Sequence, residues 1–251
     1  MTSISGIATP LAPRVAIGDA LDDPMPSRSF PCRAFQLLAV GIILTAPIFS
    51  ASARSPVLLA DPRLLLQQAW THQRFEGATD YERVKLNGTA AIRAIGRDSA
   101  SGLYREVRYR VEEHSWLEWT WRVDRLQATA DIRVKDREDF AAAIFLIFGR
   151  PSPFSRDVPT LAYVWTSDRL AEGAVIDSPH HPGSVRSIVV RSGRGRLGQW
   201  VSERRNIVDD FRQSFGREPP DTVEIIVLFT DNDQTREPVK AYYGAVMARS
   251  D

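Results

Sequence analysis

Cysteine is almost absent from the sequence, because Cys32 is the only one in 251 residues. A single thiol excludes a disulfide within the chain and a zinc site built from several thiolates. Cys32 also precedes the one long apolar run instead of ending it, so it does not match the lipid-bearing cysteine of a lipoprotein signal. Stability must come from packing, and we predict neither a cofactor nor a metal site.

An excess of charge of one sign is also lacking. The chain has 32 Lys and Arg against 31 Asp and Glu, a formal net charge of +1. So small a net charge does not steer a protein onto a phosphate backbone, which argues against nucleic acid as a partner. Hydrophobic residues are 43% and charged residues 25%, as in globular proteins, so we expect a folded body.

Long apolar runs are limited to one, residues 34–49 (AFQLLAVGIILTAPIF). Arg33 precedes this run, and Ala51-Ser52-Ala53 follows it as a small-x-small motif. This order is typical of a secretory signal peptide, here cut before Arg54. The run is short for a membrane-spanning helix, which needs about 20 apolar residues, so a retained anchor is the less favoured alternative. We predict a periplasmic or secreted protein with no membrane span after cleavage.

The ends of the mature protein follow from this prediction. Residues 1–24 contain Asp19, Asp22 and Asp23, which suit a basic leader poorly, so we predict that translation starts at Met25. Residues 1–53 then form the signal peptide region. No repeat, low-complexity tract or linker divides residues 54–251, so we expect a single domain there.

After residue 80 the apolar pattern is that of β-strands, with alternating or continuous apolar runs broken by turn residues. Asn87-Gly88 between two such runs is the dipeptide of a tight hairpin. The apolar run within residues 61–76 is too short for its periodicity to distinguish a helix from a strand. The predicted strands are 81–86, 89–95, 103–111, 116–123, 141–148, 161–166, 187–190, 199–204, 223–230 and 241–248. They predict an all-β fold with one short helix, a two-sheet β-sandwich of jelly-roll type.

Three segments carry more specific expectations. In 116–123 the apolar face made of Leu117, Trp119, Trp121 and Val123 should be core. Residues 141–148 are apolar on both faces, which favours a central strand. A helix is predicted over 207–215, capped by Asn206 and ended by Gly216.

Six motifs together resemble the bacterial family called domain of unknown function 3047, over roughly residues 70–249. They are WxWxVD (119–124), DFAA (139–142), LAYVW (161–165), GxWxxExRNIxxDF (198–211), TDNDQT (230–235) and AYYG (241–244). The resemblance implies an exported β-sandwich protein without an assigned catalytic residue. Ala143 and Ala245 depart from the family pattern, in which a basic and an acidic residue often stand there.

The segment 198–211 is the most specific local signal for a ligand. Trp200, Glu203, Arg205 and Asn206 combine an aromatic platform, a carboxylate, a planar donor and an amide, which suit the apolar face and hydroxyls of a sugar. We add Tyr243 to this candidate glycan site. The alternative is structural: Trp200 in the core, an ion pair between Glu203 and Arg205, and Asn206 as a helix cap.

Asp231 and Asp233 follow an apolar strand and are a second candidate ligand site. Their oxygens suit calcium, but Arg236 stands where an EF-hand loop requires glycine, so a turn is the favoured interpretation. The adjacent His180 and His181 are poorly placed to chelate zinc together.

No catalytic residue is predicted, since no serine elbow or ordered triad is present. Glu118, Glu203 and Asp231 leave a two-carboxylate hydrolase open. Our leading hypothesis is a non-catalytic, exported, glycan-binding β-sandwich. The alternatives are a polysaccharide-acting jelly-roll enzyme and a structural component of the cell envelope.

Overall fold

A computed structural model of the protein describes residues 54–64, 70–150, 158–167 and 169–250. The predicted signal region 1–53, with its cleavage motif and the Met25 start, lies outside these residues. The described residues belong to one compact unit. None of the helices in these ranges has both the length and the apolar character that a membrane crossing requires.

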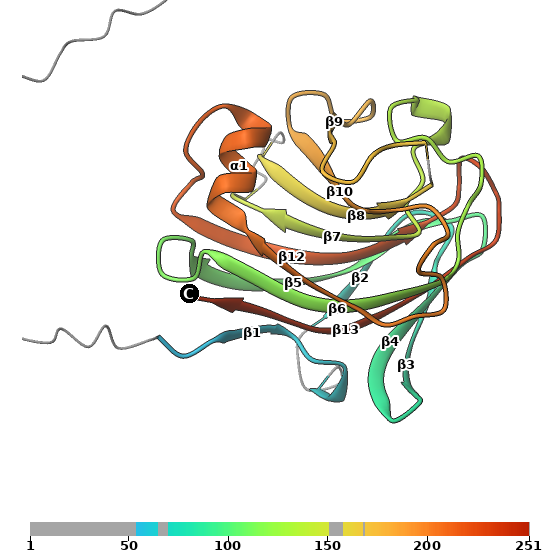
Figure 1. The fold of residues 1–251 in the computed structure, drawn as a ribbon, viewed down its shortest axis with the longest axis horizontal. Helices are drawn as coiled ribbons and strands as arrows, with labels where there is room; N and C mark the ends of the chain where they lie inside the picture. Colours follow the sequence, from blue (N-terminus) through green and yellow to red (C-terminus); the bar gives the residue numbers. More distant parts are fainter. Residues whose placement is uncertain (1–53, 65–69, 151–157, 168, 251) are drawn as a thin grey trace, which may run out of the picture. The chain divides into compact units, whose positions relative to one another are not determined.

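Two β-sheets make up the fold (Figure 1). The six-stranded sheet has the order β11-β6-β13-β4-β3, with β1 beside β13, and all its strand pairs are antiparallel. Its strands are β1 (Val57–Ala60), β3 (Asp80–Leu86), β4 (Thr89–Gly96), β6 (Trp116–Arg125), β11 (Val201–Asn206) and β13 (Val239–Arg249).

The seven-stranded sheet has the order β2-β5-β12-β7-β8-β10-β9. Its strands are antiparallel except for the pair β8 and β10. They are β2 (Thr71–Glu76), β5 (Ala100–Arg110), β7 (Ala142–Ile147), β8 (Thr160–Thr166), β9 (Val175–Asp177), β10 (Val185–Ser192) and β12 (Thr222–Asp231). Two short 3-10 helices, η1 (Pro62–Leu64) and η2 (Lys135–Arg137), and the helix α1 (Ile207–Phe215) complete the described elements.

The predicted all-β sandwich with one short helix is confirmed, and each of the ten predicted strands is present. The prediction missed β1, β2 and β9. The segment left open, 61–76, contains both η1 and β2. As expected, β7 is a central strand, between β12 and β8.

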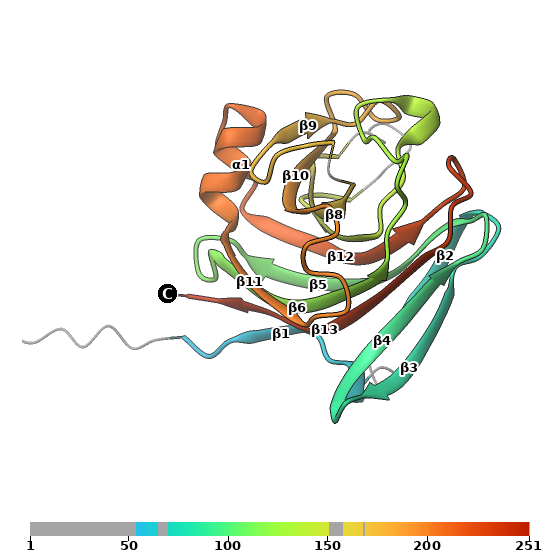
Figure 2. The same ribbon diagram turned by 45° about the vertical axis from the view of Figure 1, so that its right-hand side comes forward.

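Local signals explain two of these elements. Asn87 and Gly88 have φ angles of 49° and 84°, which close the β3–β4 hairpin that extends from the sandwich in Figure 2. Helix α1 has the predicted bounds. The Asn206 side chain accepts hydrogen bonds from the backbone nitrogens of Val208 (3.0 Å) and Asp209 (3.2 Å), and Gly216 ends the helix at φ 66°.

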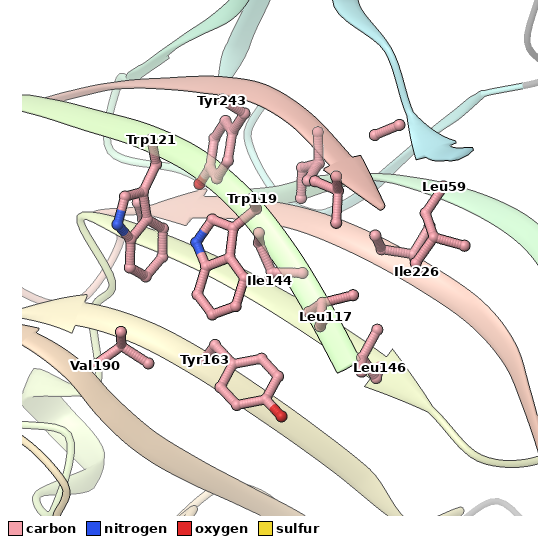
Figure 3. Packing of buried hydrophobic residues seen from close by; sticks show 14 of the residues in the cluster. Leu59, Leu117, Trp119, Trp121, Ile144, Leu146, Tyr163, Val190, Ile226 and Tyr243 are labelled. Carbon is pink, nitrogen blue, oxygen red and sulfur yellow. The ribbon is translucent and has the colours of Figure 1, made fainter. Parts of the chain in front are cut away.

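Aromatic rings from the two sheets interlock in the core (Figure 3). Trp119 packs on Tyr163, with ring centroids 5.2 Å apart, and Trp121 packs on Trp165 at 5.8 Å. The predicted inner face of β6 is confirmed, because Leu117, Trp119, Trp121 and Val123 are at most 2% exposed. Such packing of large rings supplies much of the hydrophobic stabilisation of a sandwich.

The outer faces of the two sheets differ in chemistry. The outer face of the six-stranded sheet is charged, with ion pairs such as Arg122–Asp124 (2.6 Å) and Arg204–Glu118 (3.2 Å). The outer face of the seven-stranded sheet carries a second apolar cluster, which includes Ala143, Val164 and Phe229. A sheet face that is apolar must be covered or occupied, so the outer face of the seven-stranded sheet is where a ligand site is expected.

Candidate functional site

A pocket of about 390 Å³ lies on the outer face of the seven-stranded sheet. We call it the aromatic pocket. Its base comes from β2, β5, β7 and β12, and its walls come from the segments after β6, β9 and β12. The lining residues are Phe75, Glu76, Ala100, Glu138, Phe140, Phe145, Ser178, His180, His181, Val185, Phe229, Asp231, Asp233 and Gln234.

The base of the aromatic pocket is a group of phenylalanines in contact with one another. Phe145 and Phe229 are stacked, with centroids 5.2 Å apart and an interplanar angle of 23°. Phe140 meets Phe229 edge-on at 6.2 Å. Gly102 lies beneath Phe229, since a Cβ there would be 2.8 Å from the Phe229 ring. The absence of that side chain lets the ring lie close against the sheet.

Phe75 stands at the open edge of this group. It is 71% exposed, the only exposed Phe, Tyr or Trp in the described ranges, and its ring centroid is 6.1 Å from that of Phe229. The register of β2 on β5 shifts here, since Arg74 pairs with Ser101 and Glu76 with Ala100. Phe75 is thus the extra residue of a β-bulge, a feature that commonly redirects a side chain. The exposed ring is available to a ligand.

Glu138 and His180 form part of the polar wall. Glu138 is 6% exposed, and its carboxylate lies 3.8 Å from His180 Nε2. Burial raises the pKa of Glu138, while the Ser178 hydroxyl and His180 oppose that rise. His180 Nε2 is also 3.0 Å from the Lys135 carbonyl, which joins the segment after β9 to η2.

A carboxyl cluster lies at the end of β12. Asp139, Asp231 and Asp233 each place one oxygen within 4.8 Å of the others. Asp231 accepts a hydrogen bond from the Phe140 nitrogen (2.6 Å), and Asp139 accepts from the Thr235 nitrogen (2.7 Å) and hydroxyl (2.5 Å). Burial raises the pKa of Asp231 well above its usual range, and the Asp139 charge adds to this. Burial likewise raises the pKa of Asp139.

These oxygens are close enough together to share one cation, with Asp233 as the most accessible of the three. The hydrogen bonds to Asp139 and Asp231 also give each carboxyl a structural role, fixing the segment that carries Phe140 and the turn after β12. Asp231 shares the outward face of β12 with Phe229, because residues two apart on a strand point the same way. The carboxyls therefore border the phenylalanine base.

Of the residues predicted to bind a ligand, Asp231 and Asp233 line the aromatic pocket, as do His180 and His181, which the sequence did not favour as a zinc pair. Glu203 lies elsewhere, at the inner side of β11, and is 9% exposed. Its carboxylate accepts hydrogen bonds from Arg191 Nε (2.7 Å) and Nη2 (2.9 Å) and from Trp121 Nε1 (3.1 Å). The predicted ion pair of Glu203 with Arg205 does not form, because Arg191 takes that place. Glu118 and Glu203 both line a second pocket, whereas Asp231 lines the aromatic pocket, so the three carboxylates do not meet at one site.

The other members of the predicted glycan site have partners within the fold. Arg205 donates from Nε to Asp210 (2.9 Å), and Tyr163 donates to the same carboxylate (3.0 Å). Asn206 caps α1. Trp200 is half-buried, and its ring lies 6.3 Å from that of Tyr242. These contacts match the structural alternative for Asn206, and a ligand role for the segment stays a prediction.

Tyr243 has no exposed surface. Its hydroxyl donates to the Phe229 carbonyl (2.6 Å), accepts from the Ala143 nitrogen (3.2 Å) and lies 2.7 Å from the Thr230 hydroxyl. These bonds join β13 to β7 and β12 across the sandwich. The structure thus places Tyr243 between the sheets and not at a groove with Trp200.

Sequence reasoning missed the four phenylalanines of the aromatic pocket and Glu138. The predicted glycan site was based on tryptophan. Trp119, Trp121 and Trp165 are core residues, however, and none of the six tryptophans is exposed. The available signal was the second apolar face of β7, which carries Ala143 and Phe145, because a strand apolar on both faces implies that something lies over each.

Fold and site together describe a β-sandwich with an aromatic, acid-lined pocket on the outer face of one sheet. Residues 68–247 match the family "Protein of unknown function (DUF3047)", so the chain belongs to that family, as its motifs indicated. No curated protein matches the chain in sequence.

Several solved structures are similar to the chain. The family 30 carbohydrate-binding module of a Clostridium thermocellum cellulosomal cellulase has 9% identity and a TM-score of 0.41, covering 79% of this chain and 99% of that chain. A Cel12A cellulase derived from the Rhodothermus marinus enzyme has 14% identity and a TM-score of 0.40, covering 71% and 100%. The family 11 carbohydrate-binding module from Clostridium thermocellum has 11% identity and a TM-score of 0.37, covering 79% and 96%.

Proposed function

We propose that this protein binds a carbohydrate chain in the aromatic pocket. The observation that carries the proposal is the exposed ring of Phe75, joined to the stacked pair Phe145 and Phe229 and bordered by carboxyls and imidazoles. Pyranose rings present apolar C–H faces that pack on aromatic rings, while their hydroxyls bind carboxylates and amides at the edge. Both kinds of contact are available here within one pocket.

Binding without catalysis is the form of this function that we favour. Asp139 and Asp231 are held by backbone hydrogen bonds and lie almost fully buried, which suits a supporting role for both. A hydrolase remains the second candidate, because the Asp139, Asp231 and Asp233 oxygens lie within 4.8 Å of one another. Retaining glycosidases use two carboxyl groups about 5 Å apart.

Replacing Phe75 with alanine should weaken retention on a polysaccharide that the wild type binds about tenfold, because one stacked ring contributes about 1.4 kcal/mol to binding. The measurement is affinity electrophoresis and pull-down of residues 54–251 over a panel containing cellulose, chitin, chitosan and xylan. Assay of the same mixtures for new reducing ends distinguishes binding from hydrolysis.

Leu64→Ala is the matched control, since Leu64 is also an exposed apolar residue (39%) but does not line the pocket. It should leave retention unchanged. Equal retention of wild type and Phe75→Ala on every polysaccharide, or no retention at all, would contradict the proposal.

We further propose that the protein works outside the cytoplasm, as the pattern of residues 33–53 predicts. Expression of the full chain should yield a product whose N-terminus is Arg54. N-terminal sequencing of the recovered protein checks this, and a mature product that starts at Met1 would contradict both the cleavage site and the export.

A further inference from the structure

The charged groups that line the aromatic pocket are all acidic. Glu76, Glu138, Asp231 and Asp233 line it, and none of the Arg and Lys residues that the structure describes does. Asp139 lies behind them, within the carboxyl cluster. Since the chain as a whole has nearly equal numbers of acidic and basic residues, this imbalance is a local property of the pocket.

These five carboxyls also lack basic partners. Within the described residues, no Arg or Lys nitrogen lies within 4.0 Å of any of them, and the nearest cationic candidate is His180, 3.8 Å from Glu138. The other buried carboxyls of the described residues each have an arginine partner: Asp61 has Arg63, Asp131 has Arg133, Glu203 has Arg191 and Asp210 has Arg205. Buried carboxylates are normally paired, so a pocket that leaves them without a cation is unusual.

Basic residues near the pocket in sequence do not supply the missing charge. Arg133 is bound to Asp131 at 2.8 Å. Lys135 and Arg236 are exposed and do not line the pocket. Apart from His180, no described residue brings a positive charge within 4.0 Å of these carboxyls, so a further one would come with the ligand.

We propose that the sugar bound in the aromatic pocket is cationic, a deacetylated amino sugar whose ammonium group meets the carboxyl wall. This rests on the carbohydrate-binding function proposed above. The amine of a hexosamine projects from the rim of the pyranose ring. A ring packed on Phe75 directs such a group to the edge of the phenylalanine base, where Glu76 and Asp233 lie. Charge-assisted hydrogen bonds of this kind are stronger than those to a neutral hydroxyl.

The same arrangement disfavours other classes of glycan. A uronic acid would bring a carboxylate against the carboxyls, and like charges in a partly buried site repel. A neutral glucan would fit the phenylalanines but leave the carboxyls without a counter-charge.

Three tetrasaccharides with the same β-1,4-linked backbone test the proposal, because they differ only at C2: glucosamine tetraose, N-acetylglucosamine tetraose and cellotetraose. Isothermal titration calorimetry on residues 54–251, at a pH where the amine is protonated, should give about tenfold tighter binding of glucosamine tetraose than of the other two. Added salt should reduce this preference, since the contact is ionic.

Different outcomes of these experiments test the cationic ligand and carbohydrate binding itself separately. Equal affinity for glucosamine tetraose and cellotetraose overturns the cationic ligand and leaves carbohydrate binding intact. No heat with any tetrasaccharide, together with no retention on the polysaccharide panel, overturns carbohydrate binding itself. A preference that disappears with EDTA and returns with calcium overturns the direct ammonium contact in favour of a metal ion.

Asp233→Asn tests the carboxyl wall with little effect on the fold, because Asp233 is only half-buried. It should lower the preference for glucosamine tetraose over cellotetraose about fivefold. Glu112→Gln, on an exposed turn outside the pocket, is the matched control and should leave the preference unchanged. An unchanged preference in Asp233→Asn would overturn the proposed contact.

Discussion

Replacing Glu203 with alanine is expected to lower the free energy of unfolding by about 3 kcal/mol, because the partly buried Arg191 charge loses its closest carboxylate and keeps only a 3.3 Å contact with the exposed Glu172. Arg191 Nε and Nη2 lie 2.7 and 2.9 Å from the two Glu203 oxygens, and the Arg191 side chain is only 26% exposed. The indole nitrogen of Trp121, in the core, would lose its acceptor as well. Since β11 and β10 belong to different sheets, the loss weakens the connection between them.

Urea denaturation measures this effect, with Glu218→Ala as the matched control. Glu218 also accepts from an arginine, Arg212 at 2.9 Å, but its side chain is 71% exposed, so its removal should cost less than about 0.5 kcal/mol. The double variant Glu203→Leu with Arg191→Met should recover part of the loss, because apolar groups of similar volume can replace a buried ion pair. Equal losses in Glu203→Ala and Glu218→Ala would contradict the structural role.

Tyr243→Phe is expected to cost about 2 kcal/mol, although it removes a single oxygen atom. That oxygen accepts from the buried Ala143 nitrogen and donates to the Phe229 carbonyl. Without it the Ala143 N–H loses this acceptor in a site closed to water. Thermal and urea denaturation of the variant measure the change.

Tyr104→Phe provides the comparison, because Tyr104 is half-buried on β5 and its hydroxyl has no hydrogen-bond partner among the described residues. It should unfold like the wild type. Tyr243→Phe should also keep its affinity for glycan once folded, because the hydroxyl lies between the sheets. A variant that loses binding but not stability would restore Tyr243 to the ligand site that its motif suggested.

The sequence was informative wherever one strand or one helix decided the outcome. The alternation in 116–123 identified the inner face of β6, and Asn206 with Gly216 bounded α1. Each of these signals is local, since periodicity and capping depend on neighbours in the chain. The strand β2 was missed because most of its residues are polar and exposed at a sheet edge, so they carry no alternation.

The residues of the aromatic pocket could not be identified from the sequence, and the reason is physical. Phe75, the pair Phe140 and Phe145, and Phe229 come from three parts of the chain that are far apart in sequence, and only strand order brings them together. Conversely, Glu203 and Arg205 look like a binding pair in sequence, but their partners, Arg191 and Asp210, were not identifiable without the fold. Of the predicted site, Asp231 and Asp233 reached the pocket because a strand end next to a turn is often exposed.

The strands and the connecting segments contribute different parts of the aromatic pocket, and this has an evolutionary consequence. Phe145 and Phe229 are fixed to strands in mid-sheet, whereas Phe140, Glu138, Ser178 and His180 belong to connecting segments. Substitutions in those segments alter the surroundings of a bound molecule without disturbing the interlocked tryptophans. Descendants of such a scaffold can diverge in what they recognise while inheriting the same platform, so selectivity is expected to vary faster than architecture.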